Sequence, residues 1–206
     1  IILVNPAEAM NRSTANALLK SLEEPCSGTL FLLISSEPLR LLPTIRSRCQ
    51  VVAVNVPASG ISAAALAAEG LADAGRWLAL AGGSPGLAIE LAALGQGGWL
   101  ELLTRHLAEK RAIDPIGLAG EIDKAIRESK GKLALKSVVE AMQKWLFDLT
   151  LAGNGLPVRY FVPQQATIAG LAAMIPPARL IRAYRALTTR RREAEQPLNA
   201  RLFLEG

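Results

Sequence analysis

The sequence predicts an α/β segment followed by an all-α region, within 206 residues that are 50% hydrophobic and can therefore bury a real core. Before Pro57, apolar runs that favour strands alternate with helix and turn signals. After Pro57 the composition shifts to alanine and leucine, and no further strand pattern is found. An order of strand, helix, strand, turn and strand is typical of a parallel sheet, so we expect one in the first segment.

The α/β segment should contain three strands. The expected elements are strands over residues 1–5, 29–36 and 50–56, a helix that ends near residue 24, and a helical turn over residues 39–45. The first strand should be buried, because its apolar run has no polar interruption. Asn11 or Ser13 can cap the helix, whose apolar stripe consists of Leu18, Leu19 and Leu22.

The remainder should be helical. The expected helices span residues 61–69, 71–81, 85–94, 99–111, 115–129, 133–152, 163–175 and 177–195, with a last short helix after Pro197 that Asn199 can cap. One face of the helix 133–152 should be buried in a bundle, since apolar residues recur on it at helical spacing: Leu135, Val138, Val139, Met142, Trp145, Leu146 and Leu149. The domains we expect are residues 1–57, 58–95 and 99–206, with a loop over 153–163 inside the last of them.

The composition argues against several classes of site. Cys26 and Cys49 are too few for a disulfide framework, and with His106 as the single histidine no zinc site is expected. His106 is interpreted as a helix-surface residue without a partner for catalysis. No apolar run approaches the roughly 20 residues that span a bilayer, so we expect a cytoplasmic protein without membrane contact. The apolar start of the chain leads us to expect that it is part of a longer protein.

Three stretches of the α/β segment resemble the AAA+ module of DNA polymerase clamp loaders: residues 16–25, 31–38 and 42–49. Residues 83–88 and 197–205 resemble a bacterial branch of the same family. The resemblance implies that residues 1–57 are the second half of an AAA+ core, residues 58–95 a three-helix lid and residues 99–206 a helical collar. The phosphate-binding loop and its strand would precede Ile1, so we expect an incomplete sheet with exposed edges.

The resemblance also implies a degenerate nucleotide site. ATP-hydrolysing members end the first strand in an Asp-Glu pair that serves magnesium and the attacking water, whereas this chain has Asn5 and Pro6 there. The nucleotide-sensing arginine of active members falls on Gly86, and the γ-phosphate sensor position is Ser35. We therefore expect no ATP hydrolysis and no bound cofactor or metal. The alternative is that Asn5 and Pro6 form an ordinary strand-ending turn in an unrelated fold.

The resemblance assigns a role to Arg48 within the Ser47-Arg48-Cys49 motif. In the family this arginine is a finger that reaches the γ-phosphate of ATP on the neighbouring subunit. In the sequence Arg48 has no local carboxylate partner, because Glu23 and Glu37 lie on other predicted elements; pairing with a local acid is the alternative interpretation. Ser47 and Cys49 are expected to shape the turn and pack behind the arginine.

The function implied is that of a non-catalytic subunit of the bacterial DNA polymerase III clamp loader. Its expected partners are other loader subunits, of the tau/gamma and delta types, together with the sliding clamp and primed DNA. The alternatives are an active AAA+ ATPase of the tau/gamma type and a stand-alone DNA-binding helical domain. Asn5, Pro6 and Gly86 argue against the first alternative, and the match around Arg48 argues against the second.

Two basic features have more than one interpretation. Arg12 and Ser13 begin a helix and could contact a DNA phosphate, or simply form part of the helix cap. Arg179, Arg182 and Arg185 form a basic stripe that is either a nucleic-acid surface or a solvated helix face. In a collar, the apolar residues of the same helix would be core or interface: Leu180, Ile181, Tyr184 and Leu187.

Overall fold

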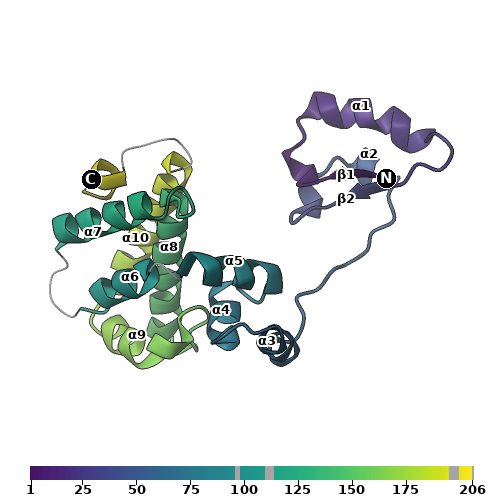
Figure 1. Ribbon diagram of the computed structural model, residues 1–206. Coiled ribbons are helices and arrows are strands. Elements are labelled where there is room, and N and C mark those ends of the chain that lie inside the picture. Colours follow the sequence, from purple (N-terminus) through teal and green to yellow (C-terminus); the bar gives the residue numbers. More distant parts are fainter. Residues whose placement is uncertain (96–97, 110–113, 195–199, 206) are drawn as a thin grey trace. The chain divides into compact units, whose positions relative to one another are not determined.

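The computed structural model describes residues 1–95, 98–109, 114–194 and 200–205, and it divides the chain into two units, Ile1–Asn55 and Val56–Gly206 (Figure 1). The first unit holds a small parallel sheet with helices, and the regular elements of the second are all helices among its described residues. The predicted order of α/β followed by all-α is confirmed. Among the described residues no single helix is long and apolar enough to cross a bilayer, although the bent pair Ala74–Leu80 and Pro85–Leu94 passes the same test of length and composition.

The first unit is built on two short parallel strands. Its elements are β1 (Ile2–Val4), η1 (Ala7–Ala9), α1 (Arg12–Glu23), β2 (Phe31–Leu33), η2 (Pro38–Arg40) and α2 (Pro43–Arg46). Leu3 is in register with Leu32, and the connection from β1 to β2 runs through α1. The expected incomplete parallel sheet is thus observed: it has two strands within the part of the chain that the structure describes.

Two expectations about the strands are wrong. Residues 50–58 form no strand, and their side chains project into solvent, with Val54 92% exposed. The first strand is not buried either, since Leu3 is 58% exposed. A strand needs a neighbour for its backbone hydrogen bonds and a covering layer for its side chains. For residues 50–58 the described residues supply no neighbouring strand.

Helix α1 begins as predicted at an asparagine cap. The side chain of Asn11 accepts a hydrogen bond from the Thr14 N–H at 2.8 Å, so Asn11 rather than Ser13 is the cap. Ala15 on α1 and Ile45 on α2 are buried, and α1 and α2 contact each other. The predicted stripe is only partly covered, as all three of its members are half-buried: Leu18, Leu19 and Leu22.

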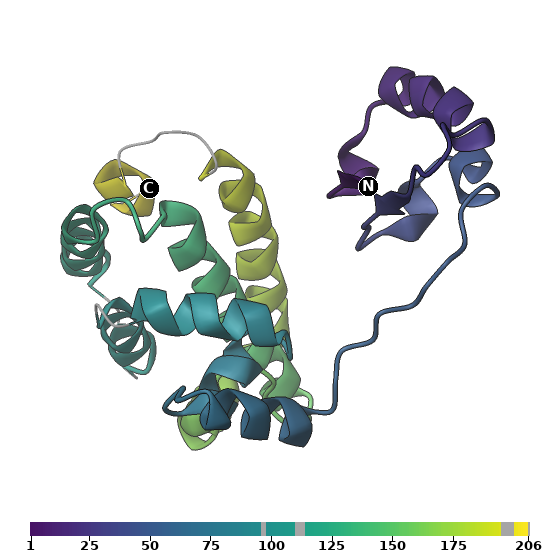
Figure 2. The same ribbon diagram turned by 45° about the vertical axis from the view of Figure 1, so that its right-hand side comes forward.

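The second unit is a set of helices around one main core (Figure 2). The helices are α3 (Ser59–Ala68), α4 (Ala74–Leu80), α5 (Pro85–Gly95), α6 (Trp99–Leu107), α7 (Pro115–Glu128), α8 (Leu135–Gly153), α9 (Gln165–Ala172), α10 (Pro177–Glu193) and α11 (Ala200–Glu205), with η3 (Val162–Gln164) before α9. All expected helices are present. Helix α6 ends at Leu107 and α10 at Glu193, earlier than the predicted ends at residues 111 and 195. The predicted cap Asn199 lies outside the described residues. Helix α4 starts later than predicted, where Asp73 takes a left-handed backbone conformation with φ of 52°.

The core of the second unit extends from Leu66 on α3 to Leu180 on α10 and includes Trp77, Trp99 and Trp145. The predicted apolar face of α8 is confirmed: its residues are buried or pack against the buried core. Because this core is continuous, the separation of residues 58–95 and 99–206 into a lid and a collar stays a prediction.

One polar residue holds the loop between α8 and α9. Asp148, on the buried side of α8, is completely buried. Its carboxylate accepts hydrogen bonds from the backbone N–H groups of Arg159 (2.8 Å), Tyr160 (3.0 Å) and Phe161 (2.7 Å). The Phe161 ring in turn packs edge-on against Trp145, with centroids 5.1 Å apart. A buried carboxylate thereby satisfies three backbone donors of a loop that has no secondary structure of its own.

Candidate functional site around Arg48

Arg48 lies in the turn that follows α2. Its Nη1 donates to the Thr44 carbonyl oxygen at 2.9 Å and approaches the Ser47 hydroxyl oxygen at 3.4 Å. The backbone N–H of Arg48 also donates to the Ile45 carbonyl at 3.0 Å, and Ile45 is buried. The helical turn is therefore anchored by one apolar side chain, and it holds the guanidinium by its own carbonyl and hydroxyl groups.

The expectation that Arg48 lacks a carboxylate partner is wrong. Nη2 of Arg48 forms an ion pair with Oε1 of Glu23, at the end of α1. The two residues are far apart in sequence, and they meet because α1 and α2 pack against each other. The pair is open to solvent, with 36% of the Arg48 side chain and 46% of the Glu23 side chain exposed. An ion pair this exposed contributes only about 0–1 kcal/mol to stability.

The neighbours of Arg48 shape the turn. The Ser47 hydroxyl donates to the Thr44 carbonyl at 3.1 Å, so the same carbonyl orients both Ser47 and Arg48. Cys49 is a half-buried free thiol, and Cys26 is an exposed one. Arg46, two residues before Arg48, is exposed and has no ion pair among the described residues.

The carboxyl end of the two strands carries the positions of the expected degenerate nucleotide site. Asn5 and Pro6 follow β1, and Ser35 follows β2. The Ser35 hydroxyl oxygen accepts from the Glu37 N–H at 3.2 Å. Among the described residues no group of three or more His, Cys, Asp or Glu side chains is arranged to hold a metal ion.

Sequence reasoning missed Glu8, which lies at this same edge. Its Oε1 accepts a hydrogen bond from the Ser36 N–H at 3.2 Å. The neighbouring backbone N–H of Glu8 and hydroxyl of Ser35 lower the pKa of the Glu8 carboxyl, because both favour its charged form. The carboxylate thus ties η1 to the end of β2. A signal was present in the sequence, because Glu8 is the only acidic residue among the first 22.

The other predicted site positions do not join a cluster of side chains in the described part of the chain. Gly86 lies in the first turn of α5, and a Cβ there would meet no atom within 4 Å. Packing therefore does not require glycine at this position. Arg12 and Ser13 are exposed at the start of α1, with no hydrogen bond or ion pair among the described residues.

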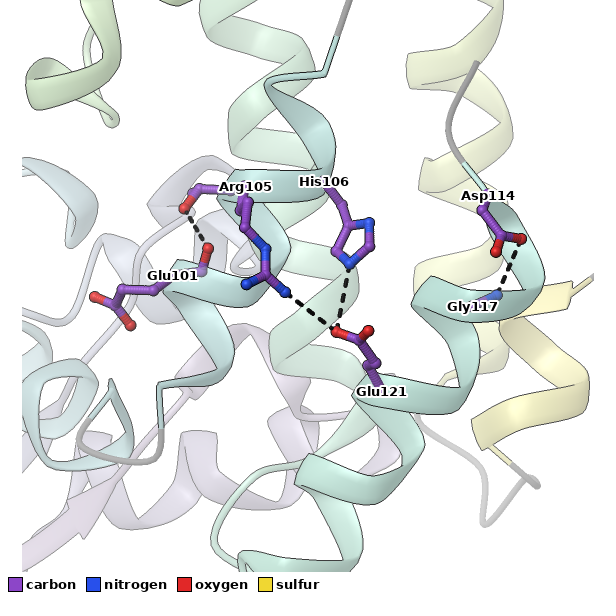
Figure 3. Close-up of polar contacts among 7 residues, drawn as sticks. Glu101, Arg105, His106, Asp114, Gly117 and Glu121 are labelled. Carbon is purple, nitrogen blue, oxygen red and sulfur yellow. Dashed lines mark hydrogen bonds and ion pairs between the residues drawn. The ribbon is translucent and has the colours of Figure 1, made fainter. Parts of the chain in front are cut away.

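His106 is the second place where the structure corrects the sequence interpretation, as Figure 3 shows. Its side chain is only 14% exposed, and its Nε2 lies 3.4 Å from Oε2 of Glu121. Nη2 of Arg105 lies 3.4 Å from the same oxygen, so one carboxylate oxygen of Glu121 on α7 contacts two side chains of α6. Asp114 caps α7 by accepting from the Gly117 N–H at 3.1 Å. This cluster joins α6 to α7 through side-chain contacts.

The α/β unit lies within the part of the chain that is similar to known proteins. Residues 1–58 match the family model described as DNA polymerase III, delta subunit. The chain is 53% identical over 89 residues to DNA polymerase III subunit delta' of Pseudomonas aeruginosa, which covers 41% of this chain and 27% of that protein. It is 39% identical over 94 residues to the subunit delta' of Escherichia coli, covering 44% of this chain and 28% of that protein.

The strands, the helix α1 and the Arg48 turn thus lie within the segment that is similar to the DNA polymerase III, delta subunit family. Within that class, the resemblance is to the delta-prime subunit, as the relatives' names state. The matched segments span about a quarter of the length of these relatives, 27% and 28%.

Proposed function

We propose that this chain acts as part of a delta-prime subunit that loads the sliding clamp on primed DNA without hydrolysing ATP itself. Arg48 is the residue through which it acts, by reaching the γ-phosphate of ATP bound to a neighbouring tau/gamma-type subunit. The observation that carries the proposal is the match of residues 1–58 to the DNA polymerase III family, which includes the Ser47-Arg48-Cys49 turn.

The geometry of Arg48 suits a finger that must exchange partners. Thr44 and Ser47 hold the guanidinium from one side, which limits the freedom it would lose on reaching a ligand. Glu23 holds it from the other side by a solvent-exposed ion pair. Releasing this pair costs about 0–1 kcal/mol, whereas a phosphate offers a bidentate, charge-assisted contact. Glu23 is therefore a resting partner that a neighbour's nucleotide can displace.

The same proposal holds that the subunit's own nucleotide site is inactive. Asn5 offers a neutral amide where a magnesium ligand is needed, and Pro6 has no side-chain base for the attacking water. Gly86 supplies no sensor arginine although packing leaves room for a side chain. In this proposal residues 58–95 serve as the lid, residues 99–206 as the collar that binds the other loader subunits, and the protein works in the cytoplasm.

The decisive experiment measures ATP hydrolysis by a reconstituted clamp loader that contains the full-length subunit, in the presence of clamp and primed DNA. Arg48→Ala should slow hydrolysis at the adjacent ATP site by about three to five orders of magnitude, the range for arginine fingers supplied in trans. The matched control is Arg46→Ala, which removes an exposed arginine two residues away and should leave the rate within about twofold of wild type.

A second variant separates the finger from a structural ion pair. Glu23→Ala removes the resting partner, so it should leave hydrolysis intact if Arg48 acts on the neighbour. Equal losses for Glu23→Ala and Arg48→Ala would show that the pair only holds α1 against α2. Unchanged hydrolysis with Arg48→Ala in an assembled loader would refute the finger, and ATP turnover by the purified full-length subunit alone would refute the inactive site.

A further inference from the structure

The positive charge of this chain is concentrated in one part of the helical unit. Residues 149–192 contain seven arginines and no aspartate, glutamate or lysine. The chain as a whole has 23 basic and 18 acidic residues, so this segment carries the entire positive excess. Its acid-free stretch begins after the buried Asp148 and ends before Glu193 on α10.

Three arginines of α10 are unneutralised. Arg190 pairs with Glu193 and Arg191 with Glu140, both near the end of the helix. The arginines of the first half are exposed, and their side chains have no hydrogen bond or ion pair with any described residue: Arg179, Arg182 and Arg185. Helix α10 packs on α8 (Figures 1 and 2). Leu180 of α10 is buried in the core, whereas the three arginines are exposed. A row of unpaired arginines attracts carboxylates or phosphates.

An apolar hollow of about 470 Å³ lies at the start of the same helix. It is formed where the ends of α8 and α9 meet the first turns of α10, and its lining residues are Thr150, Gly153, Asn154, Ala172, Ala173, Met174, Ile175, Pro176, Pro177, Leu180 and Ile181. Met174 is 63% exposed and Ile181 is 49% exposed, so the hollow presents large apolar side chains to solvent. No charged side chain lines it.

We propose that this hollow and the arginines of α10 together bind an acidic peptide segment of another protein, with an apolar side chain in the hollow and carboxylates on Arg182 and Arg185. Charge complementarity selects this occupant, because the chain segment that forms the hollow, residues 149–192, is positive and acid-free while the lining of the hollow is uncharged. The inference does not depend on the proposed role of Arg48.

A peptide fits this surface better than a nucleic acid does. Single-stranded nucleic acid binds through phosphates on basic side chains together with bases stacked on aromatic rings. No aromatic side chain lines the hollow, whereas methionine, isoleucine and proline offer the adaptable apolar contact that peptide side chains need. A surface with an apolar hollow next to exposed arginines therefore suits a peptide that carries carboxylates next to apolar side chains.

The experiment measures fluorescence anisotropy of labelled probes with the 206-residue chain. The probes are peptides of about twelve residues that alternate aspartate with leucine, lysine with leucine, or aspartate with serine, together with an oligothymidine of matched length. The aspartate-leucine peptide should bind at least about tenfold more tightly than the other three. Arg182→Glu with Arg185→Glu should weaken that binding at least about tenfold, and Ile181→Ser at least about fivefold.

The matched control is Lys124→Glu with Arg127→Glu, which makes the same change of net charge on the exposed side of α7 and should alter binding by less than about twofold. Circular dichroism confirms that each variant is folded. Equal binding of the aspartate-leucine and aspartate-serine peptides would overturn the proposal, because the hollow would then play no part. Tighter binding of oligothymidine would identify a nucleic-acid surface instead, and no binding by the aspartate-leucine peptide would exclude the site.

Discussion

Replacing Asp148 with asparagine should strongly destabilise the helical unit. Asp148 is completely buried, and its two oxygens accept the N–H groups of Arg159, Tyr160 and Phe161. Asparagine keeps one acceptor oxygen, but it places an amide NH₂ where the second oxygen was. The N–H of Phe161, which bonds that second oxygen at 2.7 Å, would then face another donor. The N–H of Tyr160 would lose its bond of 3.0 Å to the same oxygen and keep the longer one of 3.3 Å to the first.

The magnitude follows from the number of groups left unpaired. A buried polar group without a partner costs about 1–3 kcal/mol, so one or two such N–H groups predict a loss of about 1–6 kcal/mol. That is a large part of the total stability of about 5–15 kcal/mol that is typical of a domain. Asp148→Ala removes both acceptor oxygens, leaves all three N–H groups without this partner, and should cost more than Asp148→Asn.

Urea unfolding followed by tryptophan fluorescence is a suitable assay, because Trp77, Trp99 and Trp145 all lie in the core of the helical unit. With a slope of about 2 kcal/mol per M of urea, the Asp148→Asn midpoint should fall by about 0.5–3 M. Glu128→Gln, at an exposed position on α7, should change stability by less than about 0.5 kcal/mol. A midpoint shift for Asp148→Asn below about 0.5 M would refute the reasoning that this carboxylate holds the loop.

Three further predictions concern single interactions. Asn11→Ala removes the cap bond to the Thr14 N–H and should destabilise α1 by about 0.5–2 kcal/mol, seen as faster amide exchange in its first turn. The pKa of Glu8 is lowered, so its contribution to stability is present above the ordinary carboxyl pKa and is lost as the pH falls through the folded pKa. Protection of the Ser36 amide from hydrogen exchange should therefore decrease at acidic pH in the wild type, and Glu8→Gln should abolish this pH dependence. Burial lowers the pKa of Lys144, so its charge opposes folding at neutral pH, and Lys144→Met should hold or raise the urea midpoint; a clear decrease would contradict this.

The sequence predicted those parts of the fold that depend on local patterns. Period and composition located β1, β2 and every helix, and the polar residue before an apolar stripe located the Asn11 cap. Residues 50–58 show where this reasoning fails. Their alternating valines favour a strand, but a strand forms only when another strand supplies hydrogen bonds, and this information lies outside the segment itself.

The contacts of the candidate site residues were predicted less completely. Arg48 was selected from its motif, but its ion pair with Glu23 was missed, since it depends on how α1 packs against α2. The contact of His106 with Glu121 was missed for the same reason, as it joins two helices. Asp148 did have a local signal, because it is an acidic residue on the apolar face of α8, just before a loop whose backbone donors need acceptors.

Because segment 50–58 is exposed, the stability of the helical unit and the role of Arg48 can be studied separately. All three tryptophans and the main core lie after this segment, whereas Arg48 and its turn lie before it. A protease that cleaves this segment would leave the helical core covalently intact. The free energy of unfolding of the helical unit can therefore be measured on the fragment that cleavage releases. Arg48 can be substituted without removing any of the tryptophans whose fluorescence reports that unfolding.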